Sequence, residues 1–171
     1  MKKIIVWGMC VLAGLSLCSC VSKKAGLQTN FEAARTMLLD GTAECVLIRN
    51  GEIVHAEKGR GVSPLLRLYK AHKNEMAGGF IVDKVIGRAA AAIAINGKVR
   101  KVHGEVMSED GKAFLEKHGI ETSHTLLVPR ILNRDRSGLC PLEKSVEGCN
   151  DPILAQKKLE EKIREMMSRK K

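Results

Sequence analysis

Strand-like and helix-like segments alternate between residues 80 and 128, and this alternation constrains the fold more than any other feature of the sequence. Three runs suited to strands, at 80–82, 99–107 and 122–128, are separated by segments of helix-forming residues at 84–95 and 108–118. Consecutive strands that are joined through helices pair in parallel. A parallel sheet must be covered on both faces. We therefore predict a three-layer α/β/α sandwich.

The residues before this region predict an antiparallel hairpin, which makes the complete sheet mixed. Two strand-like runs, 45–48 and 53–55, flank Arg49-Asn50-Gly51-Glu52. Asn-Gly between such runs is the strongest short-range signal of a tight hairpin turn. Helices are predicted before the hairpin, at 31–39, and after it, from Ser63-Pro64 to about residue 73.

Three predicted helix starts carry polar side chains. Asp83 and Lys84 begin the alanine-rich helix, with Asp83 as its expected N-cap; Ser108 opens the next helix, and Cys140-Pro141 starts a short helical turn. In open α/β sheets, ligands bind where the carboxyl ends of strands meet the amino ends of helices. We therefore expect the three helix starts to surround one pocket.

Lys84 suggests what this pocket binds. A lysine at the positive end of a helix costs a few tenths to about 1 kcal/mol unless it pairs with Asp83 or with an anion. The alternative is that its side chain points into solvent. Ser108 is either a plain cap or a ligand contact. We predict a small anionic ligand, with contacts from Ser108, Asn133, Arg134 and Glu143.

Cys140 is the residue in this set with the most chemistry. A thiol at a helix start has a lowered pKa, and the nearby Arg134 and Arg136 would lower it further. Cys140 could then act as a nucleophile, with Asp83 and Lys84 across the pocket as catalytic partners. A structural disulfide to Cys149 is the competing interpretation in an oxidising compartment.

His55-Ala56-Glu57 matches part of a zinc-site motif. Zinc deaminases use His-x-Glu together with a later Pro-Cys-x-x-Cys. No Cys-x-x-Cys occurs in this chain, and the triplet lies on a predicted strand, where alternation directs His55 and Glu57 to the same face. We interpret both as surface strand residues, and we expect neither a metal nor another cofactor.

The layout resembles the cytidine-deaminase-like fold and, more closely, an uncharacterised bacterial and archaeal family of that fold, a domain of unknown function. The resemblance covers about residues 30–151 and rests on four stretches: Arg60-Gly61-Val62-Ser63-Pro64-Leu65-Leu66, Asp83-Lys84-Val85-Ile86-Gly87-Arg88-Ala89-Ala90-Ala91, Val106-Met107-Ser108, and Asn133-Arg134 through Cys140-Pro141-Leu142-Glu143. In this resemblance the second stretch replaces the His-x-Glu helix, and Met107-Ser108-Glu109-Asp110 replaces Pro-Cys-x-x-Cys. The resemblance therefore implies a deaminase scaffold without its zinc chemistry.

The N-terminus is typical of a bacterial lipoprotein precursor. Two lysines precede an apolar run from Ile4 to Leu17, which is too short for a comfortable membrane span. Leu17-Cys18-Ser19-Cys20 resembles a lipobox, with cleavage before Cys20 and acylation of that cysteine by chains such as palmitate. Cys18 is the poorer acceptor because a bulky Leu17 would then precede the cut. An ordinary secretory signal is the alternative.

Cleavage would divide the chain into a signal peptide (1–19), a lipidated tether (20–29), a deaminase-like domain (30–152) and a basic amphipathic helix (153–171). The formal charge of the whole chain is +10. A basic C-terminal helix beside a lipid anchor favours attraction to an anionic membrane surface. Only 3% of the residues are aromatic, which disfavours single-stranded nucleic acid as a partner.

These features predict an exported protein that is lipid-anchored in the cell membrane or outer membrane. Its partners would be the membrane and a small anionic molecule. Two other functions remain open: a non-zinc enzyme that uses Cys140, and a purely structural envelope lipoprotein.

Overall fold

The computed structural model describes residues 17–169, with side chains from residue 28 onward. Residues 1–16, which carry most of the predicted signal peptide, and residues 170–171 lie outside this range. The described elements are, in chain order, α1 (Leu17–Leu39), β1 (Cys45–Arg49), β2 (Glu52–Glu57), α2 (Ser63–Met76), β3 (Phe80–Ile86), α3 (Arg88–Asn96), β4 (Lys101–Ser108), α4 (Glu109–Lys117), β5 (Glu121–Val128), α5 (Pro141–Val146) and α6 (Pro152–Ser168).

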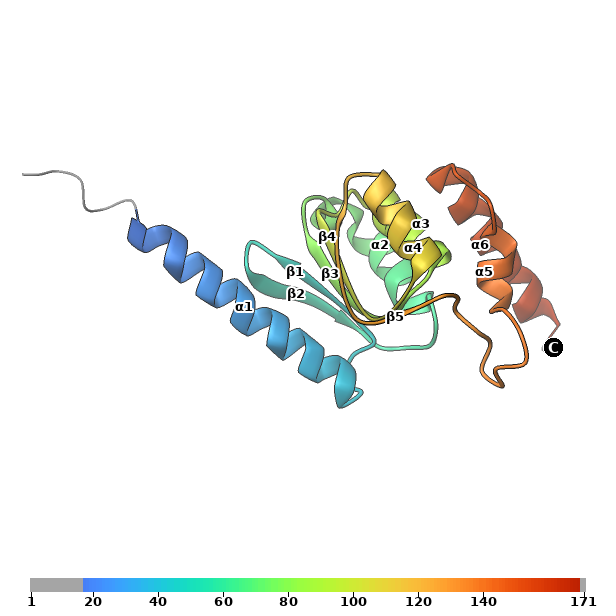
Figure 1. The fold of residues 1–171 in the computed structure, drawn as a ribbon, viewed down its shortest axis with the longest axis horizontal. Helices are drawn as coiled ribbons and strands as arrows, with labels where there is room; N and C mark the ends of the chain where they lie inside the picture. The colour runs from blue at the N-terminus through green and yellow to red at the C-terminus, as the bar shows by residue number, and fades with distance from the viewer. Residues whose placement is uncertain (1–16, 170–171) are drawn as a thin grey trace, which may run out of the picture.

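The five strands form one mixed sheet with the order β2-β1-β3-β4-β5. β1 pairs antiparallel with both β2 and β3, whereas β3, β4 and β5 pair in parallel. α1 covers one face of the sheet, and α2, α3 and α4 cover the other (Figure 1). The predicted α/β/α sandwich with a mixed sheet is therefore confirmed. α5 and α6 add an outer layer that packs on α3.

The hairpin between β1 and β2 has the predicted tight turn and also a bulge. Asn50 and Gly51 both have positive φ values, 53° and 87°, as the Asn-Gly turn requires. Leu47 pairs with His55 and Ile48 with Ile53, which leaves Val54 as the extra residue. A bulge changes the face to which a side chain points. Ile53 consequently packs on the α1 side, while His55 contacts α2.

An ion pair joins α1 to the sheet face that it covers. Arg35 of α1 donates to both carboxylate oxygens of Glu105 on β4, at 2.6 and 3.2 Å. The hydrogen bond from Arg35 lowers the pKa of Glu105 to about 2. His103, which is buried beside Glu105, packs edge-on against Phe31. Ion pairing therefore helps to fix α1 across β4.

The predicted start of the alanine-rich helix was wrong by about four residues. β3 continues through Ile86, and α3 begins only at Arg88. Asp83 is thus inside a strand and does not cap a helix. The strand tolerates the two polar residues because the Asp83 carboxylate accepts a hydrogen bond from Val85 N at 3.0 Å and Lys84 pairs with Glu44 at 2.9 Å.

The start of α1 also differs from the predicted helix at 31–39. α1 begins at Leu17, so the backbone of the expected tether at 20–29 is helical here. Within the described residues, no helix has the length and apolar character needed to cross a membrane. The start of α1 and the end of α6 lie at opposite ends of the molecule (Figure 1), so the basic helix does not lie beside the predicted anchor.

Candidate functional site

The starts of α3, α4 and α5 converge, and Glu143 of α5 lies at their centre. Its carboxylate accepts hydrogen bonds from Arg88 N at 2.8 Å and from Ala89 N at 3.0 Å. Gly87 makes this approach feasible, because a Cβ there would collide with the Glu143 carboxylate. Burial raises the pKa of Glu143, and the two backbone N–H groups oppose that rise. Glu143 therefore caps α3 from a distance of 55 residues along the chain.

Arg88 extends this junction to α4 and to the turn before α6. Its Nε and Nη2 donate to the two carboxylate oxygens of Asp110, both at 2.7 Å, and its Nη1 donates to Cys149 O at 2.6 Å. The guanidinium also lies over the ring of Phe114, 4.4 Å from its centroid. Planar, two-point pairing of this kind is the strongest that arginine forms with a carboxylate. Arg88 is only 9% exposed, whereas half of the Asp110 side chain is exposed, so the pair is shielded from solvent on the arginine side only.

Ser108 is the cap of α4, as predicted. Its Oγ accepts a hydrogen bond from Gly111 N at 3.0 Å. Gly111 packs directly on the backbone of Gly87, where a Cβ would not fit. The polar groups of the α3 and α4 starts are thus largely bound by the chain itself. We name this arrangement of Gly87, Arg88, Ser108, Asp110 and Glu143 the helix-start junction.

A cavity of about 390 Å³ lies beside the helix-start junction. Its charged lining consists of Arg88, Glu109, Asp110, Arg130, Glu143 and Glu147. Acidic groups outnumber basic ones, which disfavours the anionic ligand that the sequence predicted there. Ser108 and Glu143 line this cavity as expected.

The other predicted site residues do not line it. Asp83 is 5% exposed within the sheet, and burial raises its pKa to about 7 although Val85 N and the Cys45 thiol donate to it. Lys84 pairs with Glu44. Asn133 bonds Ser137 and Gly138 inside its own loop, and Arg134 is exposed in the same loop.

Cys140 occupies the N-cap position of α5, as predicted, and is half-buried. Its thiol is free, and so are those of Cys45 and Cys149 among the described residues. Cys149 donates instead to Asp151 O at 3.6 Å. The structure therefore neither joins Cys140 to Cys149 nor brings Asp83 and Lys84 into the cavity as catalytic partners. A nucleophilic role for Cys140 stays a prediction.

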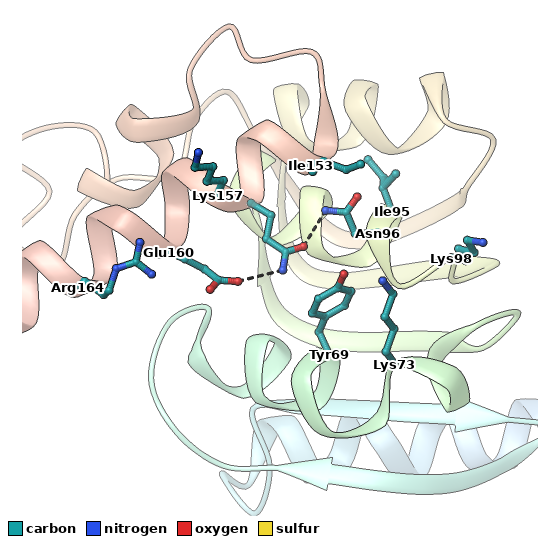
Figure 2. Close-up of a pocket in the computed structure, with 10 residues that line it drawn as sticks. Tyr69, Lys73, Ile95, Asn96, Lys98, Ile153, Lys157, Glu160 and Arg164 are labelled. Atoms are coloured by element: carbon teal, nitrogen blue, oxygen red, sulfur yellow. Dashed lines mark hydrogen bonds between the residues drawn. The ribbon is translucent and has the colours of Figure 1, made fainter.

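A second cavity, of about 560 Å³, lies between α2, the end of α3 and α6. Figure 2 shows Tyr69 and Lys73 projecting from α2 toward α6. Asn96 at the end of α3 donates a hydrogen bond to Gln156 of α6, which in turn donates to Glu160. Lys73, Lys98, Lys157 and Arg164 are exposed around it. We name this cavity the α2–α6 groove.

The charge balance of the α2–α6 groove is strongly basic. Glu160 is its single acidic side chain, and that carboxylate pairs with Lys70 at 3.1 Å. Burial favours a higher pKa for Glu160, but hydrogen bonds from Gln156 and Lys70 lower it, so the group stays ionised and paired. Sequence reasoning identified the basic character of the last helix but missed the groove, because nothing local indicated that α6 packs on α3 and faces α2.

A cluster of potential metal ligands lies apart from both cavities. His55 of β2 lies beside His72 and Glu75 of α2. In the described part of the chain, these three residues are the one group of histidine, cysteine or acidic side chains placed closely enough to share a metal ion. Glu57 is not a member, because it pairs with Arg67 at 3.1 Å. The deaminase-like spacing of His55 and Glu57 is thus unrelated to this cluster.

A family profile described as TM1506, domain of unknown function (DUF1893), matches residues 33–163. The chain belongs to this family. The crystal structure of a DUF1893 family protein, TM1506, from Thermotoga maritima has a TM-score of 0.70 and 24% identity, over 78% of this chain and 90% of that chain. The similarity confirms the resemblance to a domain of unknown function and shows the shared fold. No curated protein is significantly similar to this chain.

Deaminases are among the more distant structural neighbours. A diaminohydroxyphosphoribosylaminopyrimidine deaminase/5-amino-6-(5-phosphoribosylamino)uracil reductase from Thermotoga maritima has a TM-score of 0.42 and 15% identity, over 71% of this chain and 41% of that chain. The dCMP deaminase of cyanophage S-TIM5 has a TM-score of 0.37 and 16% identity, over 61% and 97%. At these scores the likeness supports no argument about chemistry.

The buried Asp83 predicts an unusual dependence of stability on pH. Its folded pKa of about 7 lies above the ordinary aspartate value of 3.8, so between these two pH values the folded state holds a proton that the unfolded state loses. Stability should therefore fall as pH rises from about 4 to 7 and then level off. Asp83→Asn cannot ionise. In urea unfolding, the free energy of unfolding of Asp83→Asn minus that of wild type should therefore be larger at pH 8 than at pH 5. The exposed Glu161→Gln is the control; equal pH profiles for wild type and Asp83→Asn would contradict the prediction.

Proposed function

We propose that this chain is a lipid-anchored binding protein that holds a small anion in the α2–α6 groove. The observation that carries the proposal is the charge of the groove: four exposed basic side chains surround it, and its one carboxylate is already paired with Lys70. A concave site lined by one sign of charge raises the local concentration of ligands of the opposite sign.

The rest of the groove fits a small organic anion. Its volume lies in the range of ligand pockets, which is roughly 300–1,000 Å³. Tyr69, Ile95 and Ile153 supply apolar surface between the basic groups. The ligand that suits this lining carries carboxylate or phosphate groups on a partly apolar skeleton.

The helix-start junction is a poorer candidate, both for an anion and for zinc. The N–H groups that would bind an anion at the start of α3 already donate to Glu143. A zinc site of the deaminase type needs a histidine and two thiolates. The junction instead presents the guanidinium of Arg88, a hydroxyl and carboxylates, and none of the described residues that line the adjoining cavity is a histidine or a cysteine. These residues do not fit the metal.

The lipid anchor is the second part of the proposal and rests on the lipobox around Cys20. Two or more acyl chains are needed for stable attachment, because each buried methylene contributes only about 0.8 kcal/mol. The anchor would lie near the start of α1, whereas α6, which lines the groove, lies at the opposite end of the molecule (Figure 1).

Anion binding can be measured by titration calorimetry of the full-length chain in detergent, with citrate and inorganic phosphate as probes. We expect binding that weakens as salt increases, because the groove attracts by charge. Lys73→Gln and Arg164→Gln should each weaken citrate binding about tenfold, equivalent to 1.4 kcal/mol. Lys117→Gln, which removes an exposed charge from α4, is the matched control. Equal loss in all three variants, or no binding by wild type, would refute the proposal.

Acylation of Cys20 can be followed with a clickable palmitate analogue fed to a bacterial host that expresses the chain. Wild type should take up the label and sediment with membranes. Cys20→Ser should lose both properties, whereas Cys18→Ser should keep them, because only Cys20 follows a small residue at a lipobox cut. Label retained in Cys20→Ser would show that the lipobox interpretation is wrong.

A further inference from the structure

His55, His72 and Glu75 form a compact cluster between β2 and α2. His55 Nε2 lies 2.9 Å from one oxygen of Glu75, and His72 Nδ1 lies 2.9 Å from the other. The two imidazole rings are 3.7 Å apart between centroids and tilted by 31°. Their potential ligand atoms all lie within 4.8 Å of one another. Two nitrogens and a carboxylate therefore converge on one small volume.

Local irregularities in both elements create this convergence. The bulge at Val54 turns His55 toward α2, although regular alternation from Ile53 would also have placed it on the α1 side. α2 is kinked at His72, whose φ and ψ of −132° and 30° are not helical. A bulge and a kink at facing positions are needed to bring these rings together.

Arg49 fixes the backbone at Glu75, the third residue of the cluster. Its guanidinium donates to the carbonyl oxygens of Glu75, at 2.7 Å, and of Ala77, which ties the last turn of α2 to the hairpin. The backbone beside the Glu75 carboxylate is thus fixed relative to β1 and β2. Arg49 bonds carbonyl oxygens, so the carboxylate itself remains available to the two histidines.

We propose that His55 Nε2, His72 Nδ1 and a Glu75 oxygen bind a divalent transition-metal ion, of which Zn²⁺ is the best match. Two histidines and one glutamate are a common zinc ligand set, with a fourth position open to water. Imidazole nitrogens favour zinc and its neighbours over calcium or magnesium. For binding, each ring presents the lone pair of the nitrogen that faces Glu75, with its proton on the other nitrogen.

The electrostatics of the cluster support a cation there. When both rings carry their protons on the far nitrogens, three electron-rich ligand atoms lie within 4.8 Å of one another, and a cation between them removes their mutual repulsion. A divalent ion serves all three groups at once. The side chains are also accessible, with exposed fractions of 22% for His55, 33% for His72 and 49% for Glu75.

The test uses the full-length chain in detergent, stripped of metal with a chelator and titrated with Co²⁺, which reports its ligands by absorption, followed by displacement with Zn²⁺. We expect one equivalent of Co²⁺ with visible d–d bands and without the strong ultraviolet charge-transfer band of a thiolate. His55→Gln and His72→Ala should each weaken Zn²⁺ binding by more than about tenfold. Using two variants from separate elements guards against a folding defect in one of them.

His118→Ala is the matched control, because that exposed ring, which hydrogen-bonds to Phe114 O and packs edge-on against the Phe114 ring, is not a member of the cluster. It should bind Zn²⁺ as wild type does. Three results would each overturn the proposal: no stoichiometric binding by wild type, unchanged binding in both cluster variants, or a thiolate charge-transfer band that assigns the ion to a cysteine.

Discussion

The capping of α3 by Glu143 is the interaction on which the rest of the structure depends. α3 is the central helix of the domain, and its alanines let it pack closely on the sheet, on α4 and on the outer helices. Such a buried helix start leaves backbone N–H groups that water cannot reach. Glu143 satisfies two of them and so fixes α5 over the junction, while Arg88 secures α4 and the turn into α6.

Both candidate sites include residues of α2 rather than the helix starts. With the helix starts occupied by the chain's own groups, α2 presents accessible chemistry on two sides. Tyr69 and Lys73 face α6 and line the groove, while His72 and Glu75 face β2 and meet His55. Lys73 directly follows the kink at His72. The two proposed sites therefore share α2.

Patterns that act over a few residues were readable from the sequence. The Asn50-Gly51 turn, the cap at Ser108 and the strand–helix alternation all follow from local preferences, and each is present in the structure. Asp83 was misassigned because a polar pair after three apolar residues is typical of a strand end. Only its neighbours in the sheet, Cys45 and Gly104, show that the strand continues.

The candidate sites were less predictable because they depend on distant pairings. The sequence identified Glu143 as a site residue, but its actual role comes from the start of α3, far away in the chain. His55 was noted for its spacing to Glu57, yet its side chain contacts Glu75 because of the bulge at Val54. No residue in the hairpin sequence predicts that bulge. The groove likewise needs α6 to pack beside α2.

Unfolding of Glu143→Gln in urea tests the central claim most directly. Glutamine fits the same space but presents an amide N–H to one of the two backbone donors, which leaves that buried group without an acceptor. The structure predicts a loss of about 1–3 kcal/mol in the free energy of unfolding. An unchanged or increased stability would contradict it, because residues kept for ligand binding, unlike structural caps, commonly cost stability.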